Sequence, residues 1–245
     1  MMARASRPLD KWDMVKIIGL LLMFVDHLGA YFFLDEQWLR AVGRGSAPIF
    51  LFLAGYASSY RFSPQLLLLG GLMVISNLLM GVRIFPLNIL FTLLLCRGVI
   101  YWLEKHGKRI QKPHEWFISL AILSVPTFFV FQYGALGLIF AMCGYMKRRP
   151  ERYSLKAQHG YLAAALMLHA ALAALFLDLN LVSVLLTAPV LSFDYRLLAR
   201  LEIRPVAAGR YPAWLTGLLT FSSRYSGYIY AIHLIIISWI TQYPI

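Results

Sequence analysis

The sequence predicts an all-α, polytopic integral membrane protein, folded as one domain over residues 1–245 with about eight to ten transmembrane helices. Composition is the first reason: 60% of the residues are hydrophobic and 14% are charged, against about 45–50% and about 25% in soluble domains. The mean hydropathy of +0.67 has the same meaning, because a soluble protein of this length could not bury so much apolar surface. The second reason is pattern: long apolar runs alternate with short basic segments, and no linker separates two domains.

Nine apolar runs approach the roughly 20 residues that a helix needs to cross a hydrocarbon core of about 30 Å. They lie at 15–34, 47–62, 65–82, 85–103, 116–132, 134–147, 158–177, 179–193 and 225–242. The stretch 213–221 is too short to cross alone, and it predicts an interfacial or re-entrant segment. The first run is expected to be a retained helix, because no small-residue cleavage site follows Leu34.

The basic residues predict a cytoplasmic N-terminus. Alternating from that start places 18 Lys and Arg residues on the cytoplasmic side and three on the other side, Arg40, Arg44 and Arg83, which is the bias that cytoplasmic loops carry. The 18 are Arg4, Arg7, Lys11, Lys16, Arg61, Lys105, Lys108, Arg109, Lys112, Lys147, Arg148, Arg149, Arg152, Lys156, Arg196, Arg200, Arg204 and Arg210. The lipid bilayer therefore explains the net charge of +12, and no nucleic-acid partner is expected.

Ionisable side chains lie deep inside several apolar runs, where each costs at least about 2.5–3.5 kcal/mol and so indicates function. The adjacent pair Asp26 and His27, roughly 15 Å into the first run, is the strongest candidate. Arg97 is either part of a site or a structural partner of Asp26, and His233 is equally open. His169 is expected to hydrogen-bond a neighbouring helix. Together these residues predict a polar cavity at mid-membrane depth.

Helix geometry constrains how the pair can act. Consecutive helical residues point about 100° apart, so Asp26 cannot orient the imidazole of His27 as in a hydrolase triad. We expect His27 to face the cavity as a general base, because its ordinary pKa lies near working pH. Asp26 is then expected to reach an arginine on another helix.

A second polar cluster lies in residues 39–56. Arg40 and Arg44 are four residues apart and share a face if this stretch is helical. Pro48 fits the first turn of a new helix capped by Ser46. The alternative interpretation is a pair of arginines that extend to the outer membrane surface.

The remaining polar and sulfur-containing residues suggest no further chemistry. Cys96 and Cys143 lie in apolar runs without metal-ligand spacing and predict core packing. His106 and His114 lack the other ligands of a metal site, so no metal is expected. Hydrolase, zinc-protease and nucleotide-binding motifs are absent from the sequence.

Several motifs resemble one family along most of the chain. D-x-V-K-x-x-x-x-x-x-M-x-x-D-H supplies Asp13, Lys16, Met23, Asp26 and His27; G-R-x-x-x-P-I-F supplies Gly43, Arg44, Pro48 and Phe50; Y-G-A-L-G covers 133–137; and the closing S-R-Y-x-x-Y-I-Y-x-x-H-L supplies Arg224, Tyr228, Tyr230 and His233. Together they resemble the TraX-type conjugal-transfer pilin acetylases, which are similar to the wider membrane acyltransferase group. One departure is the pair Ala231 and Ile232, where a small-residue or proline step is expected.

The resemblance implies an acetyltransferase of the bacterial inner membrane that moves an acetyl group from acetyl-CoA to an extracytoplasmic acceptor, the N-terminal amine of a pilin. It implies His27 as general base, Asp26 as its partner in the motif and Arg44 for charge stabilisation. The expected substrate-binding residues are Arg40, Arg97, Arg224, Tyr230 and His233.

Three alternatives stay open. The nearest is the same chemistry on a glycan or lipid acceptor. A proton-coupled transporter could use the same Asp, His and Arg residues as a relay, but it predicts an inverted repeat or paired broken helices, and the sequence indicates neither. A scaffold protein could use the buried charges only to set helix register.

Overall fold

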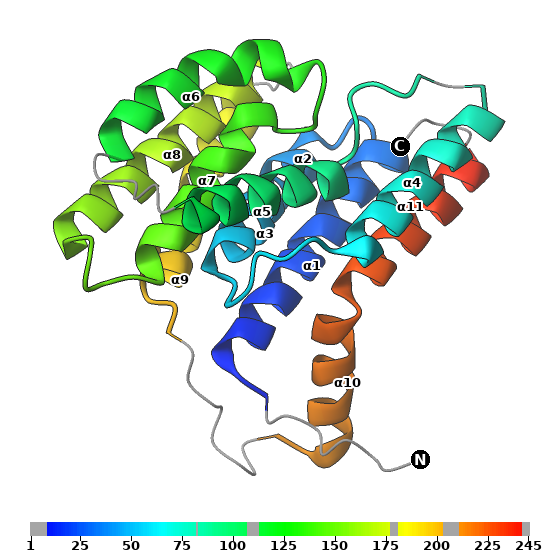
Figure 1. Cartoon of the computed structure of the whole chain (residues 1–245). Helices are drawn as coiled ribbons and strands as arrows, with labels where there is room; N and C mark the ends of the chain where they lie inside the picture. The colour runs from blue at the N-terminus through cyan, green and yellow to red at the C-terminus, as the bar shows by residue number, and fades with distance from the viewer. Residues whose placement is uncertain (1–8, 82, 107–112, 177–180, 203–210, 242–245) are drawn as a thin grey trace.

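The computed structural model describes residues 9–81, 83–106, 113–176, 181–202 and 211–241, and within these ranges the chain is built from α-helices (Figure 1). They are α1 (Lys11–Tyr31), α2 (Gln37–Gly43), α3 (Ser46–Tyr56), α4 (Pro64–Leu79), α5 (Ile89–Lys105), α6 (Pro113–Phe128), α7 (Gly134–Lys147), α8 (Leu155–Phe176), α9 (Leu181–Ala199), α10 (Ala213–Arg224) and α11 (Ser226–Thr241). The all-helical class predicted from the sequence is confirmed. Residues 82, 177, 179–180 and 242 of the predicted runs lie outside the described residues.

Three of the described helices are long and apolar enough to cross a membrane: α1, α8 and, within α9, Val182–Ala199. Four shorter apolar helices lie at Pro64–Leu79, Glu115–Phe128, Gly134–Lys147 and Ser226–Thr241. Leucines, isoleucines and tryptophans on the outer faces of α4, α10 and α11 are exposed, including Leu79, Trp214 and Ile240. Exposed apolar surface of this extent fits a membrane location.

The boundaries of the second predicted run are wrong. The run at 47–62 is helical only to Tyr56, and the helical path instead extends back through α2 to Gln37, with a break at residues 44–45. The prediction failed because Arg40 and Arg44 lower the hydropathy of this stretch. Their charges are compensated by a contact with another helix. Ser46 is the first residue of α3 and Gly45 occupies the N-cap position, so the predicted Ser46 cap is also wrong.

The helical path is also interrupted near the C-terminal end of the chain. The short apolar stretch at 213–221 belongs to α10, which ends at Arg224, and α11 begins two residues later at Ser226. In Figure 1, α10 and α11 follow one another along α1, which both helices contact. The helical path is thus interrupted at two places, between α2 and α3 and between α10 and α11.

A closely packed pair, α3 and α7, forms the centre of the bundle. Nearly every residue of both helices is buried, as expected of helices that are apolar all round. Their backbones approach at two glycines: a Cβ on Gly55 would overlap the carbonyl of Ala141, and one on Gly144 would overlap the carbonyl of Phe52. This close packing resembles the small-residue contacts of membrane helices, and it gives the polar site a rigid support.

Candidate functional site

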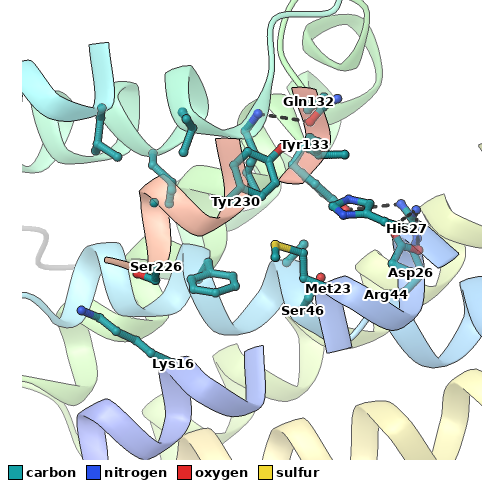
Figure 2. A pocket seen from close by; sticks show the side chains of 18 of the residues that line it. Lys16, Met23, Asp26, His27, Arg44, Ser46, Gln132, Tyr133, Ser226 and Tyr230 are labelled. Carbon is teal, nitrogen blue, oxygen red and sulfur yellow. Dashed lines mark hydrogen bonds and ion pairs between the residues drawn. The ribbon is translucent and has the colours of Figure 1, made fainter. Parts of the chain in front are cut away.

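A pocket of about 720 Å³ follows α1 on the side that faces α5 and α11. This volume is within the range of small-molecule sites, about 300–1,000 Å³. Its ionisable and hydrogen-bonding lining residues include Lys16, Asp26, His27, Tyr31, Arg40, Arg44, Ser46, Ser63, Gln65, Arg97, Gln132, Tyr133, Arg224, Ser226 and Tyr230. Figure 2 shows Asp26, His27 and Arg44 together at one end, with Lys16 and Ser226 at the other.

Asp26 lies between two arginines of the α2–α3 segment. Arg44 donates from Nε to Asp26 Oδ1 at 3.1 Å and from Nη2 to both carboxylate oxygens at 2.8 Å. The Nε of Arg40 lies 3.7 Å from Asp26 Oδ1. Asp26 is 7% exposed, and a buried carboxylate requires such compensation. The prediction that Asp26 reaches an arginine on another helix is confirmed.

Close backbone contact makes this ion pair possible. Gly43 lies directly against α1, where a Cβ would overlap the backbone of Asp26. Gly29 faces α2 in the same way, with Leu39 Cβ 2.8 Å from the position of an added Cβ. The two glycines bring α2 close enough for both arginines to reach one carboxylate, so their small size is a structural requirement of the site.

His27 is paired with a second histidine. Its Nδ1 lies 2.7 Å from Nε2 of His233, and Nδ1 of His233 lies 2.7 Å from the carbonyl oxygen of Ile229. A carbonyl can only accept, so Nδ1 of His233 carries a proton. With both rings neutral, Nε2 of His233 accepts from Nδ1 of His27, which leaves the lone pair of His27 on Nε2. The hydrogen-bond chain thus assigns the tautomer of His27.

The opposite end of the pocket is basic. Lys16 Nζ donates to the carbonyl of Ser223 at 3.5 Å, immediately before Arg224. Arg97 Nη2 donates to the carbonyls of Ser59 and Arg61 at 3.0 and 3.2 Å.

Arg97 is therefore not the partner of Asp26, and that alternative is wrong, because Arg40 and Arg44 occupy the carboxylate instead. Arg97 nevertheless lines the same pocket as Asp26.

The contacts of His169 and of the two cysteines agree with the predictions from the sequence. His169 hydrogen-bonds a neighbouring segment, as expected: its Nε2 donates to the carbonyl oxygen of Arg44 at 3.2 Å. Cys96 and Cys143 are buried free cysteines, which confirms core packing. Among the described residues, no group of three or more His, Cys, Asp or Glu side chains is placed to hold a metal ion.

Tyr133 is a site residue that sequence reasoning did not single out. Its hydroxyl accepts from Arg44 Nη1 at 3.3 Å, and its backbone has a positive φ of 68°. Non-glycine residues seldom adopt that conformation, which concentrates at functional sites. Gln132, directly before it, is held to α5 because its side chain accepts from the amide of Ile89 at 3.1 Å. The only sequence signal was the Tyr-Gly step before an apolar helix.

Comparisons with known proteins relate the chain to one family. A family model described as TraX protein matches residues 11–241. An uncharacterized protein from Rickettsia prowazekii (strain Madrid E) is 22% identical over 147 residues, which cover 59% of this chain and 58% of that protein. Proteins named Protein TraX from Escherichia coli and from Escherichia coli strain K12 are 28% and 29% identical over 148 residues, 57% of this chain and of each relative.

The aligned segments thus span less than three fifths of each curated relative. No solved structure matches the chain. The family model, in contrast, extends from the first described helix to the last and includes both ends of the pocket. The chain belongs to the TraX protein family.

Proposed function

We propose that this chain is an acetyltransferase of the bacterial inner membrane, which moves an acetyl group from cytosolic acetyl-CoA to an acceptor on the opposite side. The acceptor is the N-terminal amine of a pilin, the substrate that the sequence resemblance implies. The orientation has the N-terminus in the cytoplasm, which agrees with the 18 to three distribution of basic residues between the two sides.

The observation that carries this proposal is the hydrogen-bond chain from Ile229 through His233 to His27. An amine must lose a proton to attack a thioester, and a positioned histidine supplies the base. His233 takes the place that a carboxylate has in a hydrolase triad: it accepts from Nδ1 of His27 and so keeps Nε2 of His27 available. His27 lines the pocket, where an acceptor could reach it.

The reaction requires one base and one source of positive charge. The acceptor nitrogen attacks the acetyl carbonyl carbon while Nε2 of His27 takes the proton from that nitrogen. The tetrahedral intermediate then breaks its carbon–sulfur bond, and the leaving CoA thiolate receives the proton from His27. The products are the acetylated amine and free CoA.

Arg40 is the better placed of the two arginines to stabilise the oxyanion. Arg44 donates hydrogen bonds to Asp26 and Tyr133 from Nε, Nη1 and Nη2. In the proposal, Arg44 therefore holds α1 against the α2–α3 segment and contributes positive charge to the pocket. Arg40 lines the same pocket and has only the longer 3.7 Å contact with Asp26. A guanidinium held beside a developing oxyanion lowers the barrier electrostatically.

The direct test uses the purified full chain in nanodiscs with acetyl-labelled acetyl-CoA and a peptide that carries a pilin N-terminus. We expect label on the peptide's N-terminal amine, detected by mass spectrometry, and none on the same peptide with a blocked amine. Label on an added glycan or lipid instead would assign the alternative acceptor. Absence of CoA release with all acceptors would contradict the acetyltransferase proposal.

Substitutions at His233 test the proposed proton arrangement. His233→Gln places an amide oxygen near the position of the His233 Nε2 atom and should keep part of the activity. The shorter side chain of His233→Asn reaches only the position of Nδ1. That variant should lose about 10²–10⁴-fold in kcat, the usual contribution of general-base catalysis. The ¹⁵N NMR spectrum of histidine-labelled protein should show the Nδ1-protonated tautomer of His27 in the Gln variant but not in the Asn variant. Equal kcat values for the two variants would argue against the relay.

A transporter is the second candidate, because the helical path is interrupted beside the pocket both between α2 and α3 and between α10 and α11. Broken helices of this kind line the substrate sites of secondary transporters. The same labelled reaction separates the two functions: a transporter would consume no acetyl-CoA, whereas proton-dependent uptake into proteoliposomes would be measurable.

A further inference from the structure

We propose that Tyr133 is a catalytic residue, whose hydroxyl donates a hydrogen bond to the reacting carbonyl oxygen beside His27. The ligand atom that it recognises is the oxygen of an acyl group, which gains negative charge when the acyl carbon is attacked. This assignment rests on the proposed function for the identity of the reaction. The presence of an O–H donor at this place follows from the contacts of Tyr133 alone.

The hydroxyl of Tyr133 carries a proton that none of the described residues accepts. Its oxygen accepts from Arg44 Nη1 at 3.3 Å, which is its one hydrogen bond to the described part of the chain. A tyrosine hydroxyl can accept and donate at the same time, whereas arginine can only donate. Because Tyr133 lines the pocket, its O–H is available to a ligand there.

A chain of hydrogen bonds strengthens this donor and fixes its position. Arg44 contacts Asp26 through Nε and Nη2, and it contacts Tyr133 through Nη1. A cation beside the phenol oxygen draws electron density from the O–H bond, and linked hydrogen bonds polarise one another in a low-dielectric site. Asp26 holds the guanidinium in place before any ligand binds. A donor that is positioned in advance needs no rearrangement when charge develops.

The backbone holds Tyr133 in a conformation that favours other residue types. Its φ is 68°, a region that glycine and asparagine adopt most readily. A tyrosine kept there indicates a role for the side chain. The segment before it is fixed by two backbone hydrogen bonds, from Leu87 N to Val130 O at 2.9 Å and from Gln132 N to Leu87 O at 2.8 Å.

The ring of Tyr133 is oriented by His169. The two ring centroids are 6.0 Å apart, and Nε2 of His169 donates to the carbonyl oxygen of Arg44 at 3.2 Å. In Figure 2, Tyr133 lies with His27, Asp26 and Arg44 at one end of the pocket. The proton acceptor and the O–H donor that the reaction requires therefore come from α1 and from the turn before α7.

Tyr133 keeps its proton throughout the proposed step. Attack of the amine on the acetyl carbon moves the π electrons of the carbonyl onto its oxygen, while Nε2 of His27 takes the proton of the amine. The O–H of Tyr133 hydrogen-bonds this oxyanion, and Arg40 adds positive charge at the same end of the pocket. When the carbon–sulfur bond breaks, the carbonyl forms again and the hydrogen bond weakens.

Tyr133→Phe tests the assignment, because it removes the hydroxyl and keeps the ring. We expect kcat for acetyl transfer to fall about 10²–10³-fold, the effect of losing one oxyanion donor. The KM for acetyl-CoA should change little, because the hydrogen bond strengthens mainly in the transition state.

A second readout requires no turnover. Acetonyl-dethia-CoA is a ketone analogue of acetyl-CoA that cannot be cleaved, and its ¹³C-labelled carbonyl has a separate infrared band. Donation from Tyr133 to the ketone oxygen should shift this band to lower wavenumber when the analogue binds the full chain. Tyr133→Phe should reverse the shift.

Tyr161→Phe is the matched control, because Tyr161 is buried, does not line the pocket, and hydrogen-bonds only Met142 Sδ, at 3.9 Å, among the described residues. Equal kcat values for Tyr133→Phe and Tyr161→Phe, or a carbonyl band that is the same in wild type and Tyr133→Phe, would overturn the assignment. A lower melting temperature specific to Tyr133→Phe, with loss of analogue binding, would show a structural role and would also overturn it.

The two readouts separate this assignment from the proposed function. A Tyr133-dependent shift of the bound ketone, without acetyl transfer by the wild type, would refute only the proposed function. Transfer at the same rate with and without the Tyr133 hydroxyl would refute only the assignment. Absence of both transfer and analogue binding would contradict both.

Discussion

Replacing His27 with Gln should lower the rate of acetyl transfer about 10²–10⁴-fold, the usual contribution of a general base. Glutamine has a similar size and can still hydrogen-bond His233, but it cannot take a proton from the acceptor. The measurement is kcat for acetyl transfer to the pilin peptide, with the apparent Kd for coenzyme A in parallel. The Kd should change little, because the substitution removes a proton acceptor and keeps a polar side chain of similar size.

His106→Gln is the control for this substitution, since His106 is exposed at the end of α5 and does not line the pocket. Both variants should insert into membranes and melt near the temperature of the wild type. A His27→Gln protein with wild-type kcat would remove His27 from the reaction. A large fall in melting temperature specific to that variant would instead indicate that the His27–His233 pair is structural.

Replacing Gly43 with Ala should abolish acetyl transfer, although the substitution replaces no ionisable residue. A Cβ at this position would overlap the backbone of Asp26, so α2 must move away from α1. The bidentate contact of Arg44 with Asp26 would then lengthen or break, leaving a buried carboxylate without its partner. Breaking a buried pair costs about 3–5 kcal/mol, so both the melting temperature and the activity should fall.

Gly160→Ala is the matched control, because Gly160 lies in α8 with nothing within 4 Å of its added Cβ. There the substitution should be neutral or stabilising by about 0.5–1 kcal/mol, the helix preference of Ala over Gly. If Gly43→Ala is as stable and active as Gly160→Ala, then the close α1–α2 contact is not required for the site.

Local signals in the sequence were enough to predict much of the molecule. The apolar runs predicted an all-helical protein, and the run at 134–147 coincides with α7. The adjacent Asp26–His27 pair indicated the site, because ionisable residues within an apolar run are costly wherever the helix packs. The family resemblance also required only the order and spacing of residues.

The partners of those residues were decided by tertiary structure. Asp26 pairs with Arg44 and Arg40, not with Arg97, and His27 pairs with His233, which is 206 residues away along the chain. The sequence by itself determines which residues are polar and how far along a helix each lies. Which face of a helix meets which neighbour is decided by the close approach at Gly43 and by the breaks between α2 and α3 and between α10 and α11. These features set the rotation and the separation of the packed helices. The periodicity of the sequence alone does not specify either.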